Sequence, residues 1–125
     1  MTAGEIGAAG ATSPARGEGY PPPMAHTRRV LELEGELDAY FAPGVRERLH
    51  ELIETDGVEV VVVDLRRVSF LDSTILGLLV GGLRRMRERG GELKLVYPLP
   101  PADRIFALTG LDALFPVADP PDERV

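Results

Sequence analysis

The chain has 125 residues and a formal net charge of -6; 44% of its residues are hydrophobic and 27% are charged. This length suits one domain with a single core. The acidic balance argues against a nucleic-acid backbone as the main partner, because proteins that bind it usually carry a basic face. The absence of cysteine excludes disulfides and thiolate metal sites.

The two ends of the chain have the composition of tails. Residues 1–26 are rich in Gly, Ala, Ser and Pro and lack periodic apolar positions, and residues 120–125 also look like a loose end. We therefore expect disordered tails around one domain at 27–119. The N-terminus has no secretory pattern, and no apolar run is long enough to cross a bilayer. We expect a cytoplasmic protein that does not contact membranes.

The first predicted elements are a strand and a helix. Val30–Leu33 alternates partly between apolar and polar residues, which indicates a strand, and Ala42–Glu54 has the pattern of a helix. Pro43 suits a first-turn position, and Asp56-Gly57 ends the helix. The apolar residues at helical spacing are Val45, Leu49, Leu52 and Ile53.

The middle of the chain predicts a buried strand and a second helix. Val58–Leu65 is a short β-branched run, typical of a strand buried on both faces. The helix is predicted over Ser73–Arg89, because Gly90-Gly91 is a common C-terminal signal. The next strand is predicted at Leu93–Tyr97.

The last predicted elements are short. Pro101–Leu108 indicates a helix closed by Thr109-Gly110, and Phe115–Val117 indicates an edge strand. Alternation of strands and helices predicts an α/β fold with crossover connections and a largely parallel sheet.

The sequence offers little support for catalysis or metal binding. Ser73 as a nucleophile would need a base, usually a histidine oriented by a carboxylate. The only histidines are His26 in the tail and His50 inside the first helix, and they lack metal-ligand spacing. The two glycine pairs belong to no phosphate-binding loop pattern. We therefore predict no enzyme, no catalytic or metal-binding residue and no cofactor.

The triplet Asp72-Ser73-Thr74 interrupts an apolar run where the second helix begins. All three side chains can accept hydrogen bonds from first-turn amides, which predicts a helix cap. A helix start also favours an anion. A phosphate on Ser73 would be tolerated there and would add about -1.5 to -2 charges to the surface. The two interpretations are compatible.

The second helix predicts a core stripe and an unusual opposite face. The core stripe is Leu76, Leu79, Val80, Leu83 and Met86. The opposite face is Thr74, Leu78, Gly81, Gly82 and Arg85. Two glycines cost helix stability by about 1 kcal/mol each relative to alanine. They either allow close packing within the domain or form a partly apolar platform for a partner.

Four arginines end this helix: Arg84, Arg85, Arg87 and Arg89. Cations suit the C-terminal end of the helix dipole. We expect a solvated cluster, with a patch for an acidic partner as the alternative.

From Val30 to about Asp119 the chain resembles the STAS domain of the anti-anti-sigma factor (anti-sigma factor antagonist) family. The resemblance rests on an ordered set of motifs that spans roughly 90 of the 125 residues, which is specific although each motif alone is weak. The motifs are Leu33–Asp38, Ala42-Pro43, Val60–Leu65, Val68–Thr74, Leu76–Gly81, Arg89–Gly91, Leu108–Leu111 and Leu114–Val117.

The resemblance implies a STAS fold, with a small mixed, largely parallel sheet packed against helices. It also implies a role in bacterial transcription control. In this family the serine after Asp is phosphorylated by a partner anti-sigma factor, which is itself an ATP-using serine kinase. Only the unphosphorylated antagonist binds the kinase and frees the sigma factor, and a PP2C-type phosphatase removes the phosphate.

Carried over residue by residue, the resemblance makes Ser73 the phosphorylation site. The partner-binding residues would be Asp72, Thr74, Ile75, Gly77, Leu78, Gly81 and Asp38. Asp72 would shape the turn, and Asp38 would lie near the same surface.

The chain departs from the family pattern at two places. Ile75 stands where the family usually has glycine. It is expected to add bulk to the docking surface and so to narrow the partner set or weaken phosphorylation. The family also usually has a strand before Val30, where this chain has Tyr20–His26 with three prolines. Ile75 motivates an alternative function, a constitutive unphosphorylated scaffold in a sensory or lipid-transport complex.

Overall fold

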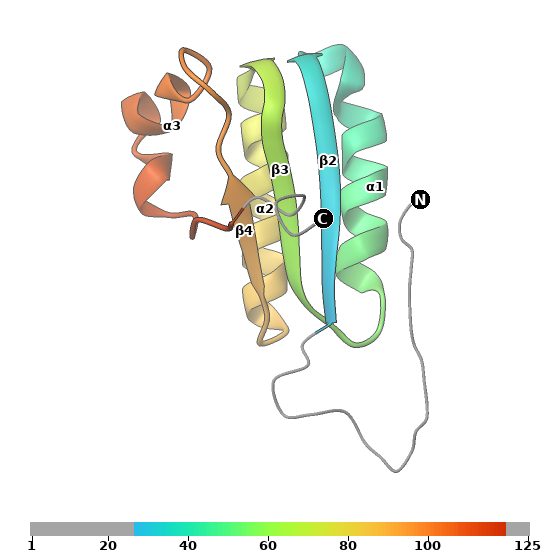
Figure 1. Ribbon diagram of the computed structural model, residues 1–125. Helices are drawn as coiled ribbons and strands as arrows, with labels where there is room; N and C mark the ends of the chain where they lie inside the picture. The colour runs from blue at the N-terminus through green and yellow to red at the C-terminus, as the bar shows by residue number, and fades with distance from the viewer. Residues whose placement is uncertain (1–26, 120–125) are drawn as a thin grey trace.

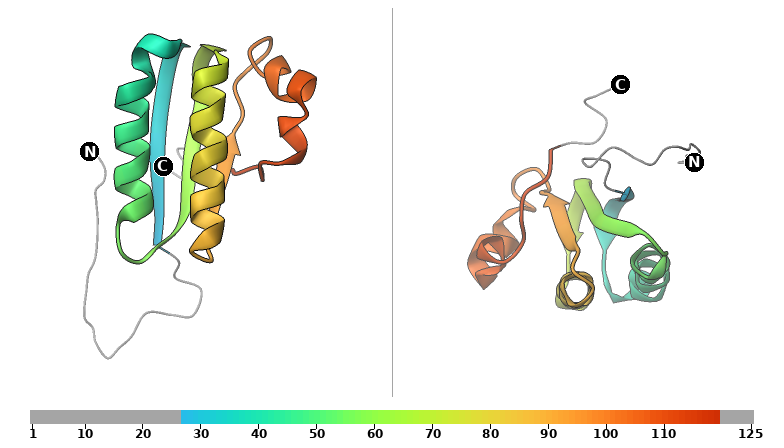
Figure 2. Two further views of the ribbon diagram at one scale, coloured as in Figure 1. Left: turned by 180° about the vertical axis from the view of Figure 1, so that it is seen from behind. Right: turned by 90° about the horizontal axis from the view of Figure 1, so that it is seen from below.

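A computed structural model of the protein describes residues 27–119. Within this range, β2 (Thr27–Leu37), β3 (Val58–Leu71) and β4 (Glu92–Val96) form a parallel sheet in that spatial order (Figure 1). The helices α1 (Ala42–Glu54) and α2 (Ser73–Glu88) cover one face of the sheet (Figure 2). The predicted α/β class with parallel strands is confirmed. No antiparallel strand, which a mixed sheet requires, occurs in this range.

Shorter elements complete the fold. A 3-10 helix, η2 (Ala39–Phe41), joins β2 to α1. The helix α3 (Arg104–Thr109) and the 3-10 helix η3 (Leu111–Ala113) follow β4, and α3 lies beyond β4 at the flank opposite α1 (Figure 1). The predicted edge strand at Phe115–Val117 is reduced to one parallel bridge between Leu95 and Val117.

The predicted boundaries agree best where a local signal marks them. Helix α1 has its predicted bounds, with proline in its first turn. Helix α2 begins at Ser73 as predicted and ends just before Arg89. Both long strands extend further than predicted: β3 continues past Leu65, because its polar stretch remains paired with β2. The predicted tails and the doubtful strand at 20–26 lie outside the described residues.

Strand β3 is buried on both faces, as its run of valines predicts. Val61 and Val63 belong to the main core under the two helices. Val62, between them, points to the other face and packs with Val96 and Ala118. Because β3 is packed on both faces, it fixes the position of Asp72, which follows its carboxyl end.

The core stripe of α2 is rotated relative to the prediction. The predicted core residues are buried, except that Val80 is half-buried. Gly82, predicted on the opposite face, is buried as well: a Cβ there would lie 3.0 Å from Leu49 Cδ2 and 3.1 Å from Leu93 Cδ1. That placement is wrong, because the glycine lets α2 pass close to α1 and β4.

Gly91 is held between α2 and β3. Its amide donates to the Met86 carbonyl at 2.8 Å. A Cβ there would lie 2.6 Å from the backbone oxygen of Glu59 and 2.7 Å from Met86 Cε. The close approach involves backbone, which cannot move aside as a side chain can.

Asp64 is the only buried charged residue in the described range. Its carboxylate accepts hydrogen bonds from Arg66 Nη2 at 2.7 Å, Arg66 Nε at 3.0 Å and the Arg66 amide at 3.1 Å. Burial alone would raise the pKa of Asp64, but the hydrogen bonds from Arg66 outweigh it and hold this pKa below its ordinary value. Asp64 and Arg66 therefore form an ion pair within β3.

Gly91→Ala is expected to lower the free energy of unfolding by about 1–3 kcal/mol, because the added methyl group overlaps the β3 backbone. The matched control is Gly81→Ala, where a Cβ meets nothing within 4 Å. It is expected to raise stability by up to about 1 kcal/mol. Urea denaturation measures both, and equal stabilities of the two variants would contradict the assignment.

Asp64→Asn is expected to destabilise the protein by about 1–2 kcal/mol near neutral pH, since Arg66 is partly exposed and solvent screens the pair. The lowered pKa makes the stabilisation fully present above the unfolded-state pKa of about 3.9 and lost as pH falls through the folded-state pKa. The stability difference between wild type and variant should therefore shrink in acid. A difference that is the same at neutral and acidic pH would contradict this.

Candidate functional site

The candidate site lies where β2 and β3 end. Leu37 and Leu71 are paired in the sheet, and the Asp72 amide donates to the Leu37 carbonyl at 3.2 Å. Asp38 and Asp72, which follow these strands, therefore lie at the same end of the sheet, where its parallel strands have their carboxyl ends. The carboxyl edge of a parallel sheet is where α/β proteins usually bind ligands.

Asp72 alone caps α2. Its backbone is extended, and its Oδ1 accepts a hydrogen bond from the Ile75 amide at 3.1 Å. Its carbonyl accepts one from the Leu76 amide at 3.1 Å. Ser73 and Thr74 are already helical, and their side chains are exposed. The predicted cap is therefore confirmed for Asp72 but not for the two hydroxyls.

The Ser73 side chain is exposed at the start of α2. It makes no hydrogen bond within residues 27–119. The first amides of a helix have no acceptor inside the helix, and of these the Asp72 carboxylate binds that of Ile75. The amides of Ser73 and Thr74 remain at the positive end of the α2 dipole, where an anion is favoured.

Ile75 is in the core and not on the predicted docking surface. Its side chain is 0% exposed and belongs to the main hydrophobic cluster. The predicted contact of Ile75 with a partner is therefore wrong. The rotation of α2 turns this position toward the sheet, so isoleucine in place of glycine anchors the helix start without adding surface bulk.

The exposed side of α2 carries the other predicted residues. We call Ser73, Thr74, Gly77, Leu78 and Gly81 the outer face; all are exposed except Leu78, which packs half-buried against the core. A Cβ on Gly77 or Gly81 would meet nothing within 4 Å. Packing within residues 27–119 therefore requires neither glycine, in contrast to Gly82 and Gly91.

The arginines at the end of α2 are partly engaged in ion pairs. Arg85 binds Glu54 of α1 through two hydrogen bonds, at 2.8 and 3.1 Å. Arg87 binds Glu92 of β4 at 2.9 Å. The hydrogen bond from Arg85 lowers the pKa of the half-buried Glu54 carboxyl. These pairs join α2 to its neighbours and favour the predicted solvated cluster over a patch for an acidic partner.

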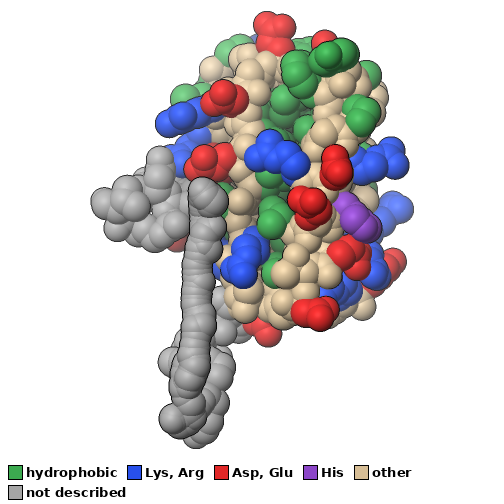
Figure 3. Space-filling view, turned by 90° about the vertical axis from the view of Figure 1, so that its right-hand side faces the viewer, with side chains coloured by type: hydrophobic (Ala, Val, Ile, Leu, Met, Phe, Trp, Pro, Cys, Tyr) green, Lys and Arg blue, Asp and Glu red, His purple; other side chains and the backbone are tan. Residues whose placement is uncertain are grey.

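Sequence reasoning missed an aromatic pair at the same end of the fold. Tyr40 and Phe41 form η2, and their rings meet edge to face with centroids 5.1 Å apart. Asp38 fixes η2, because its Oδ1 accepts a hydrogen bond from the Tyr40 amide at 3.0 Å. Figure 3 shows hydrophobic side chains gathered at the upper end of the side of the molecule where α1 lies. Two adjacent aromatics in a chain with only 6% aromatic residues were the available signal.

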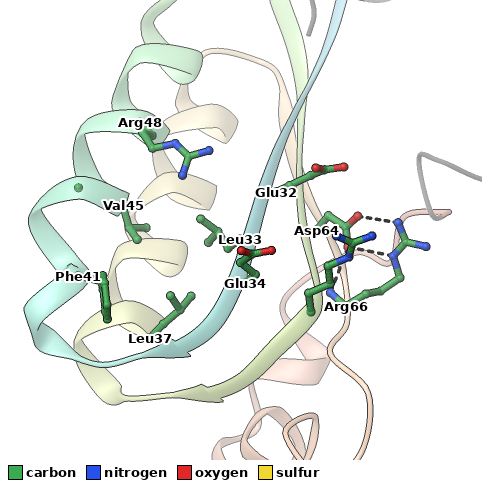
Figure 4. Close-up of a pocket in the computed structure, with 11 residues that line it drawn as sticks. Glu32, Leu33, Glu34, Leu37, Phe41, Val45, Arg48, Asp64 and Arg66 are labelled. Atoms are coloured by element: carbon green, nitrogen blue, oxygen red, sulfur yellow. Dashed lines mark hydrogen bonds and ion pairs between the residues drawn. The ribbon is translucent and has the colours of Figure 1, made fainter. Parts of the chain in front are cut away.

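A hollow of about 380 Å³ lies between α1 and β2 (Figure 4). Its apolar wall consists of Leu33, Leu37, Phe41 and Val45. Charged side chains of both signs surround this wall: Glu32, Glu34, Asp64, Arg48, Arg66 and Arg67. The mixture gives the hollow no strong preference for an anion or a cation.

The described residues contain no catalytic or metal constellation. His50 is exposed in the middle of α1 and makes no hydrogen bond to Ser73. No group of histidines and carboxylates in residues 27–119 could hold a metal ion. No helix in that range is long and apolar enough to cross a bilayer.

Comparisons with known proteins agree with the resemblance. The anti-sigma F factor antagonist of Paenibacillus polymyxa is 34% identical over 98 residues, which cover 77% of this chain and 84% of the relative. The anti-sigma-B factor antagonist of Bacillus subtilis is 36% identical over 88 residues, which cover 70% and 79%. These names are those of regulatory proteins rather than enzymes, in agreement with the prediction of no enzyme.

Solved structures show the same fold. The anti-sigma factor antagonist SpoIIAA in its unphosphorylated form matches with a TM-score of 0.66 at 26% identity, over 82% of this chain and 88% of that chain. The phosphorylated form of SpoIIAA from Bacillus matches with a TM-score of 0.60 at 26% identity, over 82% and 91%. A family model of the STAS domain matches residues 22–123. The chain therefore belongs to the STAS domain family.

Proposed function

We propose that the protein is an anti-sigma factor antagonist that is switched by phosphorylation of Ser73. The unphosphorylated form binds an anti-sigma serine kinase and so releases a sigma factor, and a PP2C-type phosphatase restores this form. The observation that carries the proposal is the exposed Ser73 hydroxyl, which makes no hydrogen bond within residues 27–119 and lies at the start of a helix capped by its neighbour. The names of the relatives support the antagonist role.

Phosphorylation of Ser73 requires no change of fold. The Ser73 Oγ attacks the γ-phosphorus of ATP, its proton passes to a base of the kinase, and ADP leaves. The Asp72 cap does not use this hydroxyl, so it persists after the transfer. The helix dipole and the first-turn amides offset part of the added charge.

The added phosphate opposes rebinding to the kinase. It places about -1.5 to -2 charges next to Asp72 in the chain and at the same end of the sheet as Asp38. In the complex these charges would lose water and face the nucleotide phosphates held by the kinase. Charge and desolvation penalties of this kind lower affinity by orders of magnitude.

The glycines of the outer face support a partner at this surface. Gly77 and Gly81 each cost α2 about 1 kcal/mol relative to alanine. Packing within the described residues does not offset this loss of helix stability, because a methyl group at either position would meet no atom within 4 Å. A glycine pair beside Ser73 allows the backbone of a kinase to come close to the helix.

The alternative function, a constitutive scaffold, has less support from the structure than from the sequence. That alternative rested on Ile75 at the docking surface, and Ile75 is buried. It remains an outcome of the binding test below.

Ser73 is expected to be the phosphate acceptor. Fractions of a lysate of the source cells, supplied with radiolabelled ATP, should contain an activity that labels the wild type but not Ser73→Ala, and this assay identifies the kinase for purification. Peptide mapping by mass spectrometry then locates the phosphate. Label at Thr74, or full labelling of Ser73→Ala, would overturn the assignment.

Ser73→Asp is expected to bind the purified kinase at least about 100-fold more weakly than the wild type, because it places a charge in the interface. Ser73→Ala is the control and should bind like the wild type. Isothermal titration calorimetry measures all three. Equal affinity for the aspartate variant would favour the constitutive scaffold.

Gly77→Ala and Gly81→Ala are expected to stabilise the protein by up to about 1 kcal/mol each, since alanine favours a helix. Each should nevertheless weaken kinase binding by about tenfold or more, because the methyl group holds the partner away. A loss of affinity with a gain in melting temperature cannot come from unfolding. Unchanged affinity would remove the outer face from the interface.

A further inference from the structure

We propose that Tyr40 and Phe41 form an aromatic anchor that the same kinase grips when it reaches Ser73. The inference rests on the proposed function and extends its contact surface from α2 to η2. Tyr40 would insert into an apolar recess of the kinase, while Phe41 would hold the Tyr40 ring in place. The pair would act as a determinant of affinity and partner choice rather than of phosphoryl transfer.

The anchor is built on the same strand ends as Ser73. The Leu37 carbonyl accepts the Asp72 amide, so the chain entering η2 and the chain entering α2 are hydrogen-bonded to each other. Asp38 caps η2 and Asp72 caps α2, one residue beyond each strand. Figure 2 shows that α1 and α2 begin at the same end of the sheet. A protein covering Ser73 can therefore also reach η2 at this end of the sheet.

The pair is exposed beyond what the fold of the described residues requires. Tyr40 is 83% exposed, and its hydroxyl makes no hydrogen bond within residues 27–119. Its ring contact is with Phe41, which is 47% exposed and forms part of the wall of the hollow between α1 and β2. Exposed tyrosines on a rigid support bury a large area at small entropic cost, which is why they dominate binding energy at interfaces.

The charges differ between the two sides of the aromatic pair. No lysine or arginine occurs between Gly35 and Val45 or between Val68 and Leu83. The carboxylates in these segments are those of Glu36, Asp38 and Asp72. On the Phe41 side, the hollow between α1 and β2 is also lined by Arg48, Arg66 and Arg67. An apolar recess of the kinase with polar groups of both signs at its border would match this surface.

The test compares Tyr40→Ser with a matched control, Leu108→Ser, in the full chain. Leu108 is also an apolar residue, is 81% exposed, and lies on α3 at the opposite flank of the sheet (Figure 1). Tyr40→Phe tests whether the ring suffices. The probe is the purified kinase identified by Ser73 labelling, and calorimetry gives the affinity. Steady-state phosphorylation gives KM and kcat, and thermal unfolding reports the fold.

Tyr40→Ser should bind about tenfold or more weakly and raise KM, with kcat within about twofold of the wild type, because Tyr40 does not touch the reacting atoms. Tyr40→Phe and Leu108→Ser should bind like the wild type. All variants should keep the wild-type melting temperature.

Other outcomes separate the two proposals. If Tyr40→Ser binds normally while Ser73→Asp does not, the anchor is refuted and the switch stands. If Tyr40→Ser loses affinity while Ser73→Asp keeps it, the anchor stands and the switch fails. Equal weakening by Leu108→Ser would also refute the anchor, since any exposed apolar residue would then contribute.

Discussion

The site depends on the three hydrogen bonds that Asp72 makes. Its amide binds the end of β2, its carboxylate binds the amide of Ile75, and its carbonyl binds the amide of Leu76. Together they fix where strand β3 stops and where α2 starts. Ser73 is consequently the first helical residue, with its side chain in water and its hydroxyl unused by the cap. The proposed phosphorylation of Ser73 would therefore leave the helix start formed.

The buried sheet holds this arrangement in place. The glycines on and just after α2 fall into two pairs, one that the packing of the fold requires and one that it does not. β3 has valines packed on both faces, so its carboxyl end cannot shift without disturbing the core. Gly82 and Gly91 let α2 come close to α1, β4 and β3. Gly77 and Gly81 have no such role within the described residues. Packing within the described residues therefore does not offset the helix stability that these two glycines cost.

Much of the fold could be predicted because local signals marked it. Proline in the first turn and apolar spacing defined α1, the valine run defined β3, and Asp72 defined the start of α2. The rotation of α2 could not be read from a hydrophobic stripe, since glycine and isoleucine at its margin are compatible with either face. Ile75 was therefore assigned to a partner and proved to be in the core. Tyr40 and Phe41 were missed because a short 3-10 helix has no periodic pattern to identify it.

The most direct test of the switch uses the phosphorylated protein itself. The affinity of the purified kinase is measured by calorimetry for the wild type before and after complete phosphorylation, with the phosphate mapped by mass spectrometry. The account predicts phosphate on Ser73, an unchanged far-ultraviolet circular dichroism spectrum and an affinity reduced by about two orders of magnitude or more. Equal affinities for the two forms would contradict it.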